Sequence, residues 1–285
     1  MAEPVSGLAR AKVNLVLEVC GRRADGYHEI DTILQEVELA DTVTVTPSTS
    51  WAVTVSGPHA AGVPEDESNL ALKAATLLAA RAGGSPVNIH LEKRIPAAGG
   101  LGGGASNAAT VLKLLRGLWP GVTPEQQVEV AEAVGSDEAF FMAGRTARAQ
   151  GRGERVTPLP ALSVHDVVLF VPPQTIERKT VRMFEALGRL PFDDGRVAAA
   201  FAQNPPARFD SAMVFNAFER VAFDLFPWLA ALWANVEART SSPVHLCGAG
   251  PCLFWIGAEG EGGRVAALAE GAPCEIILTR TVTAE

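Results

Sequence analysis

The stretch that decides the fold of this 285-residue chain is Pro96-Ala97-Ala98-Gly99-Gly100-Leu101-Gly102-Gly103-Gly104-Ala105-Ser106. Its five glycines expose backbone N–H groups with no side chains in the way. An amphipathic helix follows at once, because apolar residues recur every three or four positions at Ala108, Val111, Leu112, Leu115 and Trp119. A glycine-rich loop that runs into a helix N-terminus points amides and helix dipole at an anion. The stretch therefore predicts a phosphate-binding loop.

Three interpretations of this loop remain open on its residues alone. Glycine alone is typical of a mobile linker, although the direct junction with a helix argues against one. The bare dinucleotide pattern is met by Gly100-x-Gly102-x-x-Ala105, but the preceding strand is polar on one face and does not abut the glycines. The third interpretation is a nucleoside triphosphate loop other than the Walker A type, because no lysine ends the loop. It requires a lysine from elsewhere in the chain.

Composition narrows the class of protein. The net charge is −8 and the basic residues are scattered, which argues against nucleic acid as a partner. No segment approaches the ~20 consecutive apolar residues of a membrane span, and no secretory leader is evident. Four cysteines form no C-x-x-C pair and five histidines form no H-E-x-x-H motif, so the sequence shows no metal cluster. We expect reduced thiols, a cytoplasmic location and no membrane partner.

The residues before the loop alternate as strands and one helix. Apolar residues alternate over residues 12–19, which predicts a half-buried strand with Lys12 and Asn14 on its polar face. The turn residues 23–26 precede Tyr27 and His28. Further strands are expected at residues 42–46, 51–55 and 87–91, with a helix over residues 69–81 that Ser68 caps.

The residues after the loop predict more helices and a second region. Thr123, Pro124 and Gln126 have the spacing of a capping box, and Gly135 ends that helix. Strands are expected at residues 167–171, 253–256 and 274–278, and helices at residues 181–187, 215–226 and 264–269. The pattern indicates an α/β (α+β) protein with an N-terminal domain over residues 1–158 and a C-terminal domain over residues 159–285.

Two residues are candidates for chemistry on a hydroxyl group. Phosphoryl transfer needs an aligned acceptor oxygen, a group that takes its proton, and cations against the developing charge. Asp137, at the start of a short predicted helix, is the candidate base, and Lys12 the candidate cation. Each has a plainer alternative, since Asp is an ordinary helix cap and a strand lysine commonly faces solvent.

Four segments together resemble the GHMP small-molecule kinases. They are Ala11-Lys12-Val13-Asn14-Leu15, Gly26-Tyr27-His28-Glu29, Pro96 to Ala109, and Cys247-Gly248-Ala249-Gly250-Pro251-Cys252. The resemblance extends from residue 11 to about residue 255, in the order of that family. It implies a two-domain GHMP kinase fold with the active site in the cleft between domains. It also implies transfer of the ATP γ-phosphate to the 2-hydroxyl of diphosphocytidyl-methylerythritol, in non-mevalonate isoprenoid biosynthesis.

The same resemblance implies roles for individual residues. Lys12 and Asp137 match the catalytic pair, and residues Pro96 to Ser106 match the ATP phosphate loop. Residues that match the lining of the substrate pocket are Asn14, Tyr27, His28 and Thr180. Gly248-Ala249-Gly250 matches a loop that closes the site. ATP and Mg²⁺ are the expected co-substrate and ion, with Mg²⁺ held largely by phosphate oxygens and water. The oligomeric state stays open between monomer and homodimer.

The chain also departs from the family pattern. Glu138-Ala139 follows Asp137 where Val-Pro is usual, Ala105 replaces a serine, and Cys247 and Ala249 stand where Ser or Thr is more typical. These changes affect the geometry around Asp137 and one hydroxyl contact to phosphate. Three rival functions are kept: another kinase of this fold acting on homoserine, mevalonate or a sugar, a dinucleotide-dependent oxidoreductase, and a non-catalytic binding module.

Overall fold

A computed structural model describes residues 3–206 and 208–283. The described chain forms two compact units that interleave along the sequence. The first unit contains residues 3–11, 39–97 and 102–144, and the second contains residues 12–38, 98–101 and the described residues from 145 onward. Strands β1 (Val5–Arg22) and β2 (His28–Pro47) each run through both units. The expected domain boundary at residue 158 stays a prediction, because the division into these two interleaved units does not test it.

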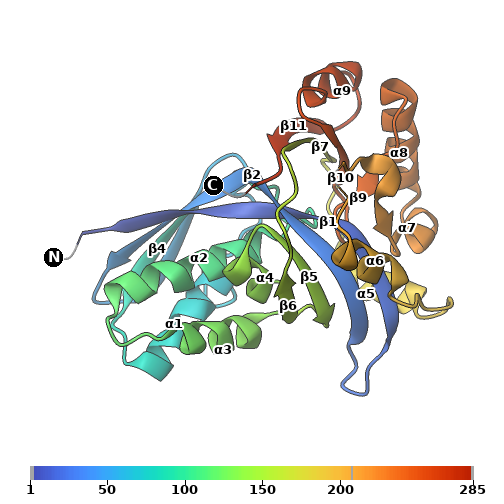
Figure 1. Cartoon of the computed structure of the whole chain (residues 1–285). Coiled ribbons are helices and arrows are strands. Elements are labelled where there is room, and N and C mark those ends of the chain that lie inside the picture. The colour runs from blue at the N-terminus through green and yellow to red at the C-terminus, as the bar shows by residue number, and fades with distance from the viewer. Residues whose placement is uncertain (1–2, 207, 284–285) are drawn as a thin grey trace. The chain divides into compact units, whose positions relative to one another are not determined.

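The first unit combines a sheet with four helices. Strand β4 (Val87–Glu92) pairs antiparallel with residues 42–47 of β2 and parallel with β3 (Ala52–Ser56). Helices α1 (Leu70–Ala82), α2 (Gly103–Leu118), α3 (Pro124–Val134) and α4 (Glu138–Ala143) lie together below these strands in Figure 1. The unit therefore has a sheet layer and a helix layer.

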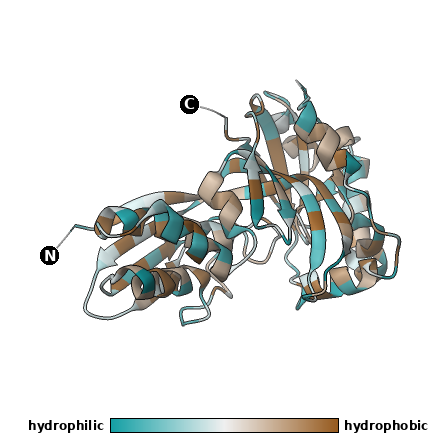
Figure 2. Cartoon of the chain, turned by 60° about the horizontal axis from the view of Figure 1, so that its bottom comes forward, coloured by the Kyte–Doolittle hydropathy of each residue, from teal (hydrophilic) through white to brown (hydrophobic). Residues whose placement is uncertain are grey.

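The core of the first unit fills the space between these layers. Apolar side chains at alternate positions of β4 are buried at Val87, Ile89 and Leu91, as a period of two requires. They join buried residues of α1 and α2 such as Leu78 and Leu112 in one cluster. Figure 2 shows teal and brown segments along the same helices, as expected where one helix face is buried and the other is solvated.

The second unit contains two sets of strands. Residues 30–35 of β2 pair antiparallel with β5 (Thr146–Gly151), which pairs with β6 (Arg155–Pro158). A four-stranded sheet has the order β11-β7-β10-β9. Its strands are β7 (His165–Val171), β9 (His245–Leu246), β10 (Leu253–Ala258) and β11 (Glu275–Arg280). The short strand β8 (Phe215–Asn216) pairs parallel with β1.

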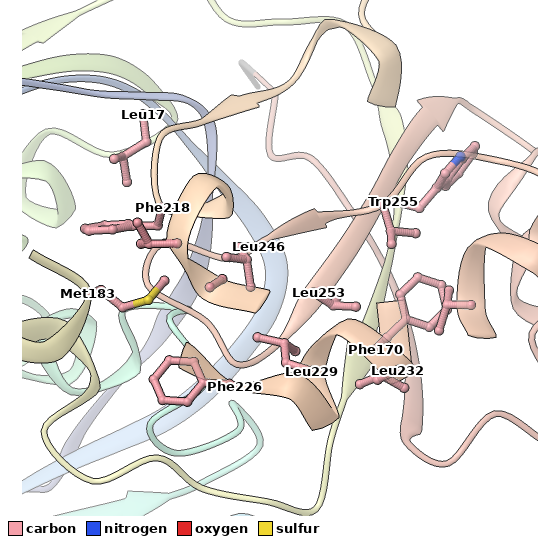
Figure 3. Close-up of a cluster of buried hydrophobic side chains, with 14 of the residues drawn as sticks. Leu17, Phe170, Met183, Phe218, Phe226, Leu229, Leu232, Leu246, Leu253 and Trp255 are labelled. Carbon is pink, nitrogen blue, oxygen red and sulfur yellow. The ribbon is translucent and has the colours of Figure 1, made fainter. Parts of the chain in front are cut away.

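Helices complete the second unit around a large apolar core. They are α5 (Lys179–Leu187), α6 (Arg196–Gln203), α7 (Glu219–Leu225), α8 (Pro227–Thr240) and α9 (Gly262–Leu268), with a 3₁₀ turn at Ser211–Met213. Figure 3 shows side chains from distant segments meeting in this core, including Leu17, Met183 and Phe226. Burial of each such side chain contributes ~1.5–3 kcal/mol, so this core fixes β1 and α5 in place.

Most predicted elements are confirmed, including the capping box at Thr123 and Gln126. Four details of the prediction are wrong. Asn69, not Ser68, caps α1, because its side chain accepts a bond of 2.9 Å from the Ala71 N–H. Helix α2 begins at Gly103, so the last glycines of the loop form its first turn. The expected helix 215–226 is strand β8 followed by α7.

The fourth error concerns β1. The strand was expected to be half-buried, but both of its faces are covered from Ala11 to Val19. Its polar residues Lys12 and Asn14 are only 5% and 3% exposed.

Among the described residues, no helix has the length and apolar character needed to cross a membrane.

Candidate active site

Lys12 and Asn14 form the buried polar face of β1 in the second unit. The Lys12 ammonium donates to Asn14 Oδ1 at 2.8 Å, and Asn14 Nδ2 donates to Thr32 Oγ1 at 2.8 Å. Thr32 in turn donates to the Val16 carbonyl. A buried lysine needs polar partners, and this chain of hydrogen bonds fixes the direction of its side chain. The solvent-facing alternative for Lys12 is therefore excluded.

The loop residues 98–101 lie directly against Lys12 and against residues 247–252, the second glycine segment. The Lys12 backbone N–H donates to the Leu101 carbonyl at 3.0 Å, and the Cys252 N–H donates to the Gly99 carbonyl at 3.2 Å. A Cβ on Gly248 would lie 3.2 Å from both the Gly100 carbonyl oxygen and Lys12 Nζ. The structure therefore brings Lys12, Asn14, part of the loop and Gly248 together in one unit.

The remaining loop residues, Gly102 to Ser106, belong to the first unit and open α2. Gly102 has a left-handed φ of 73° and precedes the helix, whose first turn carries no acidic residue. The Ser106 N–H bonds the Gly102 carbonyl at 2.9 Å, while the N–H groups of the preceding helical residues have no partner within an α-helix. Such a terminus is suited to phosphate oxygens. Ala105, in place of a serine, is buried and leaves these backbone groups unchanged.

The buried ion pair of Lys93 and Asp41 in the first unit supports the residues just before the loop and the start of α2. Lys93 Nζ donates to Asp41 Oδ2 and, at 2.7 Å, to Asn107 Oδ1 on α2. Asp41 Oδ1 accepts the backbone N–H groups of Arg94 at 2.7 Å and Ile95 at 2.8 Å, just before the loop begins. A Cβ on Gly103 would lie 3.4 Å from Lys93 Nζ. The network ties the strand end to the first turns of α2.

Asp137 lies in the first unit at the N-cap position of α4. Its side chain makes no capping hydrogen bond to that helix, so the plain capping role is not the one it has here. The following residue, Glu138, is buried, and a Cβ on Gly135 would lie 2.5 Å from its Oε2. Because residue 135 is a glycine, there is room for the Glu138 side chain, which stands where the family usually has valine. The catalytic pairing of Asp137 with Lys12 stays a prediction.

Tyr27 and His28 follow the turn between β1 and β2. The His28 ring stacks on Phe184 of α5, with centroids 4.5 Å apart and planes inclined by 12°, and Phe192 lies edge-on at 6.3 Å. Partial burial and the nearby Arg22 lower the pKa of His28, so the imidazole is neutral at pH 7. Tyr27 is 53% exposed, with the Arg152 guanidinium 5.3 Å from its ring centroid. The His28, Phe184 and Phe192 rings form one aromatic cluster, and Tyr27, the residue before His28, presents an exposed ring.

Two further residues hold the second glycine segment and were not singled out in the sequence. Asn216 of β8 donates to the carbonyls of Leu246 at 3.0 Å and Gly248 at 2.8 Å. Lys179, the first residue of α5, donates to the carbonyls of Ala98 and Gly250. The next residue, Thr180, is exposed. No local pattern marks Lys179 or Asn216, because the carbonyls to which they donate are 30 or more residues away in the chain.

The chain is similar in sequence to proteins of known name. Residues 69–145, which include the whole loop and Asp137, match the GHMP kinases N terminal domain. A 4-diphosphocytidyl-2-C-methyl-D-erythritol kinase of Dehalococcoides mccartyi is 40% identical over 252 residues, 87% of each chain. One of the same name from Pelotomaculum thermopropionicum is 35% identical over 97% of this chain and 98% of its own.

A solved structure agrees in fold as well as in sequence. The crystal structure of a 4-(cytidine 5'-diphospho)-2C-methyl-D-erythritol kinase is 33% identical, covers 98% of this chain and 100% of its own, and superposes with a TM-score of 0.76. The expected GHMP kinase fold is thereby confirmed. With its glycine-rich loop, its buried Lys12 and these relatives, the chain belongs to the 4-diphosphocytidyl-2-C-methyl-D-erythritol kinases of the GHMP kinase family.

Proposed function

We propose that this protein transfers the γ-phosphate of ATP to the 2-hydroxyl of 4-diphosphocytidyl-2-C-methyl-D-erythritol, a step of non-mevalonate isoprenoid precursor synthesis. The observation that carries the proposal is Lys12, a lysine buried on β1 that touches both glycine-rich segments. A charge is rarely buried in such a place without a role for it. The relatives' names supply the acceptor.

In the proposed reaction Asp137 accepts the proton of the acceptor hydroxyl as its oxygen attacks the γ-phosphorus. The new O–P bond forms while the bond between the γ-phosphorus and the β–γ bridging oxygen breaks, and ADP leaves. Lys12 stabilises the negative charge that spreads over the transferring group. Residues 96–106 form the proposed ATP phosphate loop. Its backbone N–H groups, apart from Ser106 N–H, which is bonded within α2, and Pro96, which has none, hold the phosphates without a particular side chain at Ala105.

The proposed acceptor site uses Asn14, Tyr27, His28 and Thr180. The neutral His28 ring can both donate and accept hydrogen bonds, as recognition of a cytosine edge requires. Tyr27 offers an aromatic face, which suits stacking with a base. A cytidine diphosphate group, and not a nucleic acid, is the proposed partner. Free thiols at Cys20, Cys247, Cys252 and Cys274 support a reducing, cytoplasmic compartment.

Mg²⁺ is the proposed ion, and it would neutralise charge between the β- and γ-phosphates. The described residues contain no group of three or more His, Cys, Asp or Glu side chains placed to hold a metal. Phosphate oxygens and water are therefore its proposed main ligands, in keeping with the reluctance of Mg²⁺ to lose water.

The experiment is an acceptor panel with the purified protein, ATP and Mg²⁺. ADP release and the mass of the phosphorylated product are measured with the cytidine-linked acceptor, homoserine, mevalonate and a hexose. Turnover that requires the cytidine-linked acceptor supports the proposal. Equal or faster turnover with another acceptor would assign the chain to a different kinase reaction, and protection from unfolding by NADH but not by ATP would favour the oxidoreductase.

A further inference from the structure

Lys179 bridges the two glycine-rich segments of the second unit. Its ammonium donates to the carbonyl of Ala98, in the phosphate loop, and to the carbonyl of Gly250, in the second glycine segment. These two acceptors are 152 residues apart in sequence. One side chain thus fixes the position of one segment relative to the other.

The backbone at one of the two acceptors, Ala98, has a conformation that needs support. Ala98 has a φ of 56° and Gly250 a φ of 74°, both in the left-handed region. For a residue with a Cβ, such as Ala98, this conformation is sterically unfavourable, whereas glycine adopts it freely. The bond from Lys179 to the Ala98 carbonyl holds the peptide group that this conformation orients. The Cys252 N–H bond to the Gly99 carbonyl ties the same two segments a second time.

The charge environment of Lys179 is unusual for a purely structural lysine. Burial, with the nearby positive charge of Lys12, lowers the pKa of Lys179 to about 8. Burial also raises the pKa of the Cys252 thiol to about 12 and that of Cys247 well above its ordinary value, so both stay neutral. Lys12 and Lys179 therefore lie near one another, and no carboxylate is among the groups that shift the pKa of Lys179. A bound anion is the ligand that would complete this arrangement.

We infer that Lys179 is a positioning residue for phosphoryl transfer, which holds loop residues 98–101 against Gly250 and adds a second positive charge to the phosphate site beside Lys12. The inference rests on the proposed function, because it assumes that residues 96–106 receive the ATP phosphates. It assigns Lys179 no contact with the acceptor and no proton transfer.

The first test measures affinity for a non-hydrolysable ATP analogue by calorimetry, so it does not depend on the acceptor. Lys179→Met removes both hydrogen bonds and the charge, and we expect at least about tenfold weaker binding at pH 7, since hydrogen bonds from a charged donor are stronger than neutral ones. The matched control is Lys73→Met, on the exposed face of α1, with unchanged affinity expected. Affinity within about twofold of wild type in Lys179→Met would overturn the inference.

The second test uses pH and does not require that the methionine variant fold. Raising the pH through about 8 neutralises Lys179, so the analogue affinity of the wild type should fall across that range. Lys179→Arg stays charged there, because the arginine pKa lies above ~12, and its affinity should remain level. The same decline in both proteins would overturn the inference. If the wild type binds the analogue but phosphorylates no cytidine-linked acceptor, the proposed function fails while these two tests still decide the role of Lys179.

Discussion

Gly100 lies so close to Cys247 that a Cβ at Gly100 would be 1.8 Å from the Cys247 carbonyl oxygen. The backbone of Gly100 is also left-handed, with a φ of 89°. Only glycine satisfies both conditions without moving one of the two glycine-rich segments. The glycines of the loop therefore have two roles, since they expose amides to phosphate and let the two segments approach each other.

Gly100→Ala should consequently destabilise the protein and weaken ATP binding. We expect a loss of about 3 kcal/mol or more in the free energy of unfolding, because backbone must shift as well as adopt a strained φ. Urea unfolding checks the stability and calorimetry with an ATP analogue checks the binding. Gly117→Ala is the control, since Gly117 lies within α2 with nothing within 4 Å of an added Cβ. That control should gain ~0.5–1 kcal/mol, and a similar gain in Gly100→Ala would show that the close approach is not needed.

Asp137→Asn should abolish turnover while nucleotide binding stays nearly intact. Loss of a general base lowers kcat by ~10²–10⁴-fold, whereas the amide keeps the size of the side chain. Lys12→Met should behave in the same way, because it removes charge stabilisation in the transition state. Steady-state kinetics give kcat and calorimetry gives the analogue affinity. Asp224→Asn, an exposed position on α7, is the control. Wild-type turnover in Asp137→Asn would remove Asp137 from the mechanism.

Asp41→Asn should disrupt the first unit around the loop. Asp41 is fully buried and accepts bonds from the Lys93 and Asn107 side chains and from two backbone N–H groups. Breaking a buried ion pair by removing one charge costs ~3–5 kcal/mol, because the Lys93 charge remains in place. Thermal or urea unfolding measures this cost. The control is Glu92→Gln, whose surface ion pair with Arg94 contributes below ~1 kcal/mol. Equal effects of the two changes would contradict this account of the network.

The pKa of Lys179 predicts a pH dependence of stability. The pKa of Lys179 is about 8 in the folded protein, and that of an unshifted lysine, as in the unfolded chain, is 10.5. Between these two pH values the unfolded chain therefore binds more protons than the folded protein. Stability should therefore rise with pH across this window in the wild type. Lys179→Met lacks this contribution, so any stability advantage it has over the wild type should shrink as the pH rises from about 8 to about 10. Urea midpoints of both proteins across that range measure the difference, and a constant difference would argue against a lowered Lys179 pKa.

Local signals in the sequence predicted the local structure well. The spacing of Thr123, Pro124 and Gln126 fixes the start of α3, because a capping box involves only neighbouring residues. The junction of the glycines with α2 was likewise visible, although the helix begins earlier, at Gly103. Strand β4 followed from its alternation alone. In each case the deciding interactions lie within a few residues of one another.

Tertiary contacts decided the features that the sequence did not reveal. The polar face of β1 was expected to be solvated, but Lys12 and Asn14 are buried by segments that follow far along the chain. Phe215 was expected to begin a helix, yet it pairs with Val16 of β1 in a two-residue strand. Lys179 has acceptors at residues 98 and 250. Such long-range pairing leaves no local periodicity from which it can be inferred.

The most direct test of the central claim is a crystal structure of the protein with a non-hydrolysable ATP analogue and Mg²⁺. We expect the phosphate oxygens to accept hydrogen bonds from backbone N–H groups of residues 99–105, with the γ-phosphate nearest to Lys12. Phosphates bound away from these amides would contradict the account, whatever the protein's activity proves to be.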